Sequence, residues 1–221
     1  MIGRNITVRV VDNRLVYDGG EIICSYFTPD YAAWADRLRA SLAGSGVPFD
    51  LMAVDKRPGG WEANTMLKPR MVLQAMTKHP TKKVVFVDAD AVLAGDITKL
   101  TQASADVSLY WRAKRKRGGR VVLKPMSGTL VIRDNDRSRR FIENWIAATT
   151  ECAFDDTDET ALALAITRTP GLTIEAIDHD LVAIGEPTPA SVIVHAKANR
   201  EHKKVKPWAR VAHELRVKLG L

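Results

Sequence analysis

The chain has 221 residues, of which 46% are hydrophobic and 27% are charged, with two cysteines and a formal net charge of +7. These values exclude a disordered chain, a fibrous protein and a disulfide-stabilised scaffold, and the length fits one domain with or without an appendage. No run approaches the roughly 18 apolar residues of a membrane helix and the N-terminus lacks the apolar core of a secretory signal, so we expect a cytoplasmic protein.

The first half of the chain alternates predicted strands and helices. Thr28 and Pro29 are typical of a helix start, and KVVFV at 83–87 is the clearest strand. Short connections between alternating strands and helices indicate βαβ units and a parallel sheet. In chain order the predicted elements are a hairpin or edge strand at 6–17, a strand at 21–27, a helix from 28 to about 43, a strand at 49–54, a helix at about 62–78 and a strand at 83–87.

The second half has a more mixed pattern. Its predicted elements are strands at 107–111, 121–123, 129–132, 172–177 and 192–194, helices at about 134–148 and 156–167, and an amphipathic helix from near Pro207. The simplest arrangement is one α/β domain over residues 1–221. Its core would span 21–200, with a hairpin or edge strand at 1–20 and a basic C-terminal helix at 201–221.

The positive charge lies in two stretches. Arg112–Arg120 holds six basic residues and no acid, and Lys197–Lys218 holds eight basic residues and two acids. Together they carry +12, so the rest of the chain carries −5. This separation predicts an anionic partner rather than a uniformly basic protein.

Two carboxylates follow the clearest strand directly, as Asp88 and Asp90 in VVFVDADA. Open α/β sheets bind ligands beyond the carboxyl ends of their strands, where both side chains would project. Paired oxygen ligands there suit Mg²⁺ or Mn²⁺ and a substrate diphosphate. Asp-x-Asp also occurs in ordinary turns, and its place at the end of a buried strand favours the functional interpretation.

The segment FVDADAVLAGDI resembles the Asp-x-Asp motif of GT-A nucleotide-sugar glycosyltransferases, especially the retaining enzymes of the glycogenin and bacterial galactosyltransferase kind. Three other segments resemble the same family, namely SYFTPDYAAWADRLRASL, GGWEANTMLKPRMVLQAM and SGTLVIRDNDRSRRFIENW. The resemblance covers roughly residues 21–200. It implies a single GT-A (Rossmann-like) domain with a mostly parallel central sheet, a divalent metal, a UDP-sugar donor and transfer to an acceptor hydroxyl.

The resemblance also implies a ligand set. Asp88 and Asp90 would hold the metal, and His195, at the end of a predicted strand, would be the third ligand. An imidazole ligand favours Mn²⁺ over Mg²⁺. A second cluster, Asp178-His179-Asp180, is a weaker alternative. The family's His-x-x-Gly-x-x-Lys-Pro-Trp run is not intact in HAKANREHKKVKPW, so Lys197 and Lys203 both stay open as diphosphate contacts.

The family places an Asp-Gln or Asp-Glu pair beside the sugar at a helix start. Asp158 and Glu159 match that place and are the expected catalytic residues, with Asp158 expected to act at the anomeric carbon. Acids at a helix N-terminus are favoured by the helix dipole in any case. Tyr31 could instead be a core aromatic, Lys68 a solvated helix lysine and Trp61 an anchor of its loop. The expected donor-binding residues are Thr28, Tyr31, Trp61, Lys68, Ala89, Ser127, Gly128 and Lys197.

The basic stretches bear on the acceptor. A dense basic patch binds nucleic acid without sequence preference, so the leading hypothesis is DNA with a hydroxymethylated base, as in viral genome modification, with the base extruded for transfer. A viral member would act in the host cytoplasm. The alternatives are a saccharide or lipid-linked saccharide, with the basic residues solvated or on anionic lipid, and a nucleic-acid-binding protein with an inactive site. The expected acceptor-binding residues are Arg112, Lys114, Arg115, Lys116, Arg117, Arg120, Lys203 and Lys204.

Overall fold

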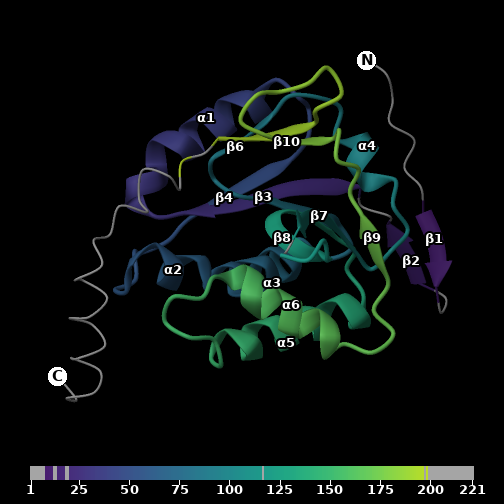
Figure 1. Cartoon of the computed structure of the whole chain (residues 1–221). Coiled ribbons are helices and arrows are strands. Elements are labelled where there is room, and N and C mark those ends of the chain that lie inside the picture. The colour runs from purple at the N-terminus through teal and green to yellow at the C-terminus, as the bar shows by residue number, and fades with distance from the viewer. Residues whose placement is uncertain (1–7, 12–13, 18–19, 116, 197, 199–221) are drawn as a thin grey trace.

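A computed structural model describes residues 8–11, 14–17, 20–115, 117–196 and 198 (Figure 1). The predicted helix near Pro207 and the candidate residues Lys116, Lys197, Lys203 and Lys204 lie outside this part of the chain. A central sheet lies between two layers, with helix α1 (Ala32–Ala43) on one face and the remaining long helices on the other. Those helices are α3 (Lys68–Lys78), α5 (Asp136–Thr149) and α6 (Asp158–Thr167).

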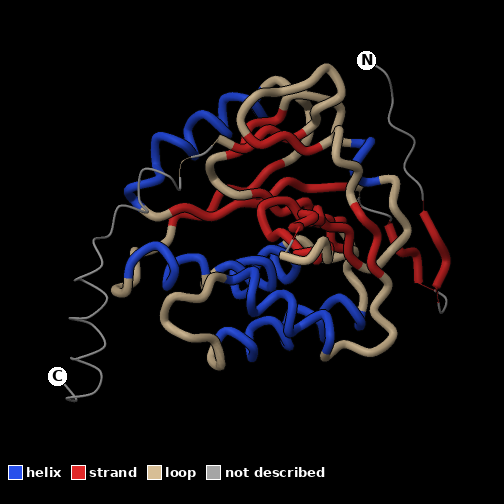
Figure 2. Tube along the Cα trace, viewed as in Figure 1, coloured by secondary structure: helices blue, strands red, loops and turns tan. Residues whose placement is uncertain are grey.

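The central sheet is mixed, and most of its strands are parallel. Its strands lie between the two helical layers (Figure 2). Among the described residues its strand order is β4 (Phe49–Ala53), β3 (Glu21–Phe27), β5 (Lys83–Val87), β8 (Val121–Ile132), β7 (Val107–Arg115) and β9 (Ile174–Ala176). Only β8 runs against the others, because it is antiparallel to both β5 and β7. The expected α/β class with a mostly parallel sheet is confirmed. The other five strands therefore end at the same edge.

Smaller elements complete the described part of the chain. Strands β10 (Val182–Ile184), β11 (Ile193–His195) and β6 (Ala91–Leu93) form a second sheet in that order, on the α1 side. The N-terminal segment, expected as a hairpin or an edge strand, is a hairpin of β1 (Val8–Val11) and β2 (Arg14–Tyr17). The remaining elements are η1 (Pro29–Tyr31), α2 (Gly60–Thr65) and α4 (Thr98–Thr101). Strands β6 and β10 and helix α4 were not predicted, since three or four residues are too few to show a hydrophobic period.

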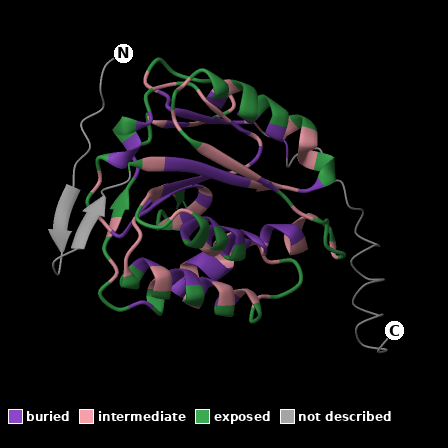
Figure 3. Cartoon of the chain, turned by 180° about the vertical axis from the view of Figure 1, so that it is seen from behind, coloured by how far each residue is buried: buried purple, intermediate pink, exposed green. Residues whose placement is uncertain are grey.

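Two apolar cores form on the two faces of the sheet. On β3 and β5, Ile22 and Phe86 pack toward α3, α5 and α6, whereas Ile23, Val85 and Val87 pack toward α1 and the small sheet. A strand covered on both faces is apolar along its length, which explains why both strands were predicted with their observed bounds. Figure 3 shows these strands buried between helices whose outer faces are exposed.

The helix predicted at 62–78 is two helices, α2 and α3. Pro69 lies in the first turn of α3 and has no N–H to donate into a preceding turn. The chain therefore ends α2 at Thr65 and restarts at Lys68. The start of the helix expected from residue 28 also differs. Residues Pro29–Tyr31 form a 3₁₀ turn before α1, and the Thr28 hydroxyl donates to Asp30 (2.6 Å) and does not cap that turn.

Strands β7 and β8 differ most from expectation. The predicted strands at 121–123 and 129–132 are one strand, and Arg112–Arg115, expected in a loop, belong to β7. The pairing jumps from Leu109 opposite Leu130 to Tyr110 opposite Met126, so residues 127–129 have no partner on β7. Such a bulge bends a strand and redirects its side chains. The bulge lies beside the end of β5, where Asp88 N–H donates to the Gly128 carbonyl (2.9 Å).

Candidate functional site

A cavity of about 200 Å³ opens at the carboxyl edge of the sheet, between the ends of β3 and β5 and the start of α6. Its wall combines aromatic side chains with carboxylates, a lysine and an imidazole, the composition of a small-molecule site. Its lining residues include Tyr26, Thr28, Tyr31, Trp61, Asn64, Thr65, Lys68, Asp88, Ala89, Asp90, Tyr110, Arg112, Met126, Ser127, Gly128, Thr129, Asp158, Glu159, Val182, Ile184 and His195.

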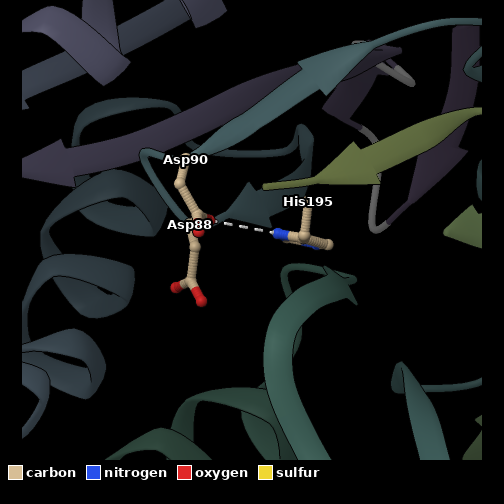
Figure 4. A group of neighbouring side chains, drawn as sticks. All are labelled: Asp88, Asp90 and His195. Atoms are coloured by element: carbon tan, nitrogen blue, oxygen red, sulfur yellow. Dashed lines mark ion pairs between the residues drawn. The ribbon is translucent and has the colours of Figure 1, made fainter. Parts of the chain in front are cut away.

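Asp88, Asp90 and His195 meet in this cavity (Figure 4). One ligand atom from each lies within 4.8 Å of the others, and His195 Nδ1 is 3.5 Å from Asp90 Oδ1. In the described part of the chain this is the one such cluster of three, so Asp178, His179 and Asp180 do not form a second. Pairing of β11 with β6 places His195 opposite Ala91 and so carries it to the aspartates.

The β8 bulge completes this cluster. Thr129 Oγ1 and His195 Nε2 share a hydrogen bond of 2.8 Å, which leaves Nδ1 directed at Asp90. A Cβ atom on Gly128 would lie 3.3 Å from Asp88 Oδ2 and 3.4 Å from His195 Cε1. Glycine therefore keeps the space between the carboxylate and the imidazole open. Two carboxylates and an imidazole whose second nitrogen is held by a hydroxyl are a suitable donor set for a divalent cation.

Lys68 lies behind the cluster and is 4% exposed. Its ammonium is 2.7 Å from Asp88 Oδ1 and 3.1 Å from Asp158 Oδ2, and it donates to Ser127 Oγ (2.9 Å). Burial alone would lower the pKa of Lys68, but the charges of Asp158 and Asp88 outweigh it and raise that pKa above its usual value. Lys68 is thus a buried cation, and the solvated-lysine alternative is wrong.

Asp158 begins α6 and is 2% exposed. The Trp145 indole donates to its carbonyl (3.0 Å), and its own N–H donates to Thr65 Oγ1 (3.4 Å). Its Oδ2 is within ion-pair distance of Lys68 yet accepts no well-aligned hydrogen bond from the described residues. A buried carboxylate oxygen in this state is suited to a ligand hydroxyl.

Glu159, the next residue, forms an ion pair with Lys124 of β8 at 2.5 Å, with the carboxylate 19% exposed. The pair joins the start of α6 to the β7–β8 hairpin. The ion pair of Lys124 with Glu159 was not predicted, because it joins residues that are 35 positions apart in the sequence.

Tyr31 and Trp61 also line the cavity. Burial, with a smaller effect from the charge of Asp90, raises the pKa of Tyr31 to about 12, so its hydroxyl is neutral. Asn64 fixes the adjacent loop, since its amide donates to the Arg57 carbonyl (3.0 Å) and its Oδ1 accepts from Arg57 N–H (2.8 Å). Asn64 and Thr129 gave no signal in the sequence, since each acts through a contact with a distant segment.

The predicted site residues divide into two groups. Every metal, catalytic and donor-binding candidate within the described residues lines the cavity. Of the basic candidates only Arg112 does, and Lys114, Arg115, Arg117 and Arg120 lie farther along the β7–β8 hairpin. No helix in the described part of the chain is long and apolar enough to cross a membrane.

Several solved glycosyltransferases share this fold. One involved in glycosylation of the major capsid of PBCV-1 aligns with a TM-score of 0.62 at 14% identity, over 79% of this chain and 91% of that chain. The galactosyltransferase LgtC, solved with donor and acceptor sugar analogues, gives 0.52 at 12% identity, over 85% and 89%. GlyE of Streptococcus pneumoniae TIGR4 gives 0.51 at 13% identity, over 79% of this chain and 54% of GlyE, so this chain spans about half of GlyE.

A scan against protein-family models and a search of the curated proteins each found no match. Because these structural neighbours are only 12% to 14% identical to this chain, the structural similarity establishes the fold alone. The chain therefore has the GT-A-like α/β fold that these glycosyltransferases share.

Proposed function

We propose that the protein is a metal-dependent glycosyltransferase that moves a sugar from a UDP-sugar to an acceptor hydroxyl. The observation that carries this proposal is the meeting of Asp88, Asp90 and His195 beside the buried Lys68–Asp158 pair in one cavity. The GT-A-like fold supports it, since solved chains of this fold include glycosyltransferases.

The metal ligands would be Asp88, Asp90 and His195. The open space above Gly128 and the hydrogen bond that orients the imidazole fit a bound cation, and the nitrogen ligand favours Mn²⁺ over Mg²⁺. A divalent cation here would offset the negative charge that develops on the departing diphosphate.

The donor would lie between the metal ligands and α6. We assign the nucleotide to the wall with Thr28, Tyr31 and Trp61, and the diphosphate to the region of Ala89 and Lys68. The Lys68 ammonium is held in place by two carboxylates, so its positive field acts on the diphosphate without reorganisation. Ser127 and Gly128 let the backbone approach the sugar closely.

Asp158 and Glu159 would act on the sugar. Asp158 Oδ2 lies 3.1 Å from the Lys68 ammonium but accepts no well-aligned hydrogen bond from the described residues, so it would accept one from a sugar hydroxyl. Glu159, held by Lys124, would place negative charge near the anomeric carbon as it becomes cationic. Transfer breaks the bond from this carbon to the diphosphate and forms one to the acceptor oxygen. We propose retention of configuration, with the departing phosphate oxygen taking the acceptor proton.

The chemical identity of the acceptor is the second part of the proposal. DNA with a hydroxymethylated base is the sequence-based candidate, supported by the basic residues of the β7–β8 hairpin and by the position of Arg112 on the cavity wall. A saccharide or lipid-linked saccharide is the second candidate. It is favoured by exposed apolar side chains on the same hairpin, Val121 and Leu123.

The donor half is tested by slow hydrolysis of UDP-sugars in Mn²⁺ without acceptor. We expect UDP release by the unaltered chain and a loss of about a hundredfold or more in Asp88→Asn, because metal stabilisation contributes several kcal/mol. Glu175→Gln, which removes an exposed carboxylate on β9, is the matched control and should keep the rate. If no nucleotide sugar is hydrolysed and Mn²⁺ with UDP leaves the melting temperature unchanged, the proposal is wrong.

The acceptor half is tested with labelled UDP-sugar, Mn²⁺ and DNA containing 5-hydroxymethylcytosine or 5-hydroxymethyluracil. Incorporation into DNA supports the first candidate. Label found in oligosaccharide or lipid extracts and absent from DNA rejects it in favour of the second.

A further inference from the structure

The outer half of the β7–β8 hairpin is a two-stranded arm. We define the arm as Tyr110–Arg115 and Val121–Met126, which pair with each other from Tyr110 opposite Met126 to Arg115 opposite Val121. Among the described residues no third strand joins it, because β9 pairs only with Val107–Leu109 and β5 only with Thr129–Ile132. The inner end of the arm packs on the domain, through the Tyr110–His179 hydrogen bond (2.9 Å) and through Trp111 against the apolar core. A pair of strands beyond that end gains little from its own packing, so a surface that covers the outer end of the arm would stabilise it.

The arm exposes apolar side chains. Val121 is 52% exposed and Leu123 is 60% exposed, the two highest values among the large hydrophobic residues that the structure describes as exposed. Residues two apart on a strand share a face, so both point to the same side, together with Ala113 and Arg115, which lie directly opposite them. One face of the arm thus has two aliphatic side chains and a cation.

The other face of the arm and its turn are basic. Arg112 and Lys124 lie opposite each other, Arg112 on the cavity wall and Lys124 in its ion pair with Glu159. From Arg112 to Lys124 the sequence has seven basic residues and no acid. A partner that meets the whole arm must therefore accept aliphatic and cationic groups side by side.

We propose that the arm docks on an anionic phospholipid bilayer and so brings the cavity to an acceptor at that surface. An interface of this kind accepts aliphatic side chains at the acyl boundary and cations at the headgroups. Arg115 can keep its guanidinium at headgroup level while its stem lies beside Val121, its partner on β8. DNA phosphates would bind the cations, but they would gain no binding energy from the exposed aliphatic side chains of Val121 and Leu123. The choice of acceptor at the bilayer rests on the proposed glycosyl transfer, whereas the docking itself does not.

The test is flotation of the full chain with vesicles of phosphatidylcholine alone or with phosphatidylglycerol added. We expect binding only to the anionic vesicles, with an affinity that falls as salt rises. Val121→Ser with Leu123→Ser should weaken binding about tenfold. Arg115→Gln with Arg117→Gln should weaken it by about fivefold for each charge removed.

Matched variants separate the arm from general charge and apolarity. Lys99→Gln with Arg140→Gln removes two exposed cations elsewhere, and Phe154→Ser removes an exposed apolar side chain elsewhere; both should keep vesicle binding. Equal losses in arm and control variants would overturn the proposal, as would unchanged binding in the arm variants. Binding to duplex DNA that is tighter than to anionic vesicles and unaffected by the change at Leu123 would also overturn it.

Hydrolysis of UDP-sugar without acceptor keeps the two proposals apart. The Val121 and Leu123 changes should leave that rate as it is. Arm-dependent vesicle binding without any hydrolysis would reject the glycosyltransferase and retain the docking surface, and hydrolysis without arm-dependent binding would do the reverse.

Discussion

The Lys68 ammonium lies 3.1 Å from Asp158 Oδ2, and each of the two side chains is less than 5% exposed. Their residues are 90 positions apart and begin two different helices, α3 and α6. The same ammonium reaches Asp88, so this buried pair connects the end of β5 to both helices. The Lys68 ammonium therefore contributes both to the stability of the fold and to the proposed chemistry.

Lys68→Met should be strongly destabilising, because it leaves Asp158 buried without its counter-charge. Removing one member of a buried ion pair costs about 3–5 kcal/mol, and the loss should appear as a lower free energy of unfolding in urea. Lys78→Met, which removes the exposed partner of Asp50 and leaves that carboxylate with His79, is the control and should cost under about 1 kcal/mol. Similar costs for the two variants would contradict the burial argument.

Gly128→Ala should impair cation binding and leave the fold intact. The added Cβ would lie 3.3 Å from Asp88 Oδ2 and 3.4 Å from His195 Cε1, so one of the two must move. We expect a smaller rise in melting temperature on adding Mn²⁺ than the unaltered chain shows. Gly44→Ala places its Cβ in open space at φ −93° and should leave the Mn²⁺ effect unchanged; an equal Mn²⁺ effect in both would count against a cation site at Gly128.

Thr129→Val should weaken Mn²⁺ binding about 10–100-fold, since partners that orient a ligating histidine have effects of this size. Valine is close in shape to threonine but cannot share the 2.8 Å hydrogen bond with His195 Nε2. Titration calorimetry with Mn²⁺ measures the change. Thr129→Ser keeps the hydroxyl and should retain most of the affinity, and an affinity in the valine variant equal to that of the serine variant would remove Thr129 from the site.

Alkaline pH should destabilise the protein through Cys24. Burial, followed by the charge of Asp50, raises the pKa of the Cys24 thiol from 9.0 to about 12. Between these values the unfolded chain releases the proton and the folded chain keeps it, so the free energy of unfolding falls as pH rises, by about 1.4 kcal/mol per pH unit from this group. Below pH 9 the contribution is fully present.

Urea unfolding at a series of pH values measures that slope. Cys24→Ala should flatten it between pH 9 and 10 and make it shallower from pH 10 to 12, where the raised pKa of Tyr31 still contributes, even if the variant is less stable at pH 7. Cys152→Ala, at a half-buried thiol, should keep most of the slope. A slope that is the same in Cys24→Ala as in the unaltered chain would show that other groups cause the alkaline loss.

The sequence predicted best where a single local rule decides the structure. Strands β3 and β5 were found with their observed bounds because both faces of each strand are covered, which makes most of each segment apolar. Helix α6 was found because acids at its start and apolar residues after it agree. Asp88 and Asp90 followed from β5 by position alone.

The prediction was wrong where pairing overrides local signals. The sequence predicted two strands, at 121–123 and 129–132, yet β8 is one strand that runs through Pro125 and Gly128. Outward of Thr129, no strand among the described residues pairs with β8 on its β5 side, so a residue without an N–H is tolerated there. The split at Pro69 is the opposite case, in which a local rule ended a helix that the apolar period continued.

The sequence by itself determined the α/β class, the strand that ends at Asp88 and the kinds of side chain available for a metal. Only the tertiary structure decided that His195 reaches the aspartates, that Lys68 is buried against Asp158, and that the basic stretch continues the sheet as an arm with Val121 and Leu123 exposed. The physical reason is the sequence separation over which each interaction acts. Hydrophobic period and helix capping act over a few residues, whereas these contacts depend on strand order and on a bulge that no local pattern encodes.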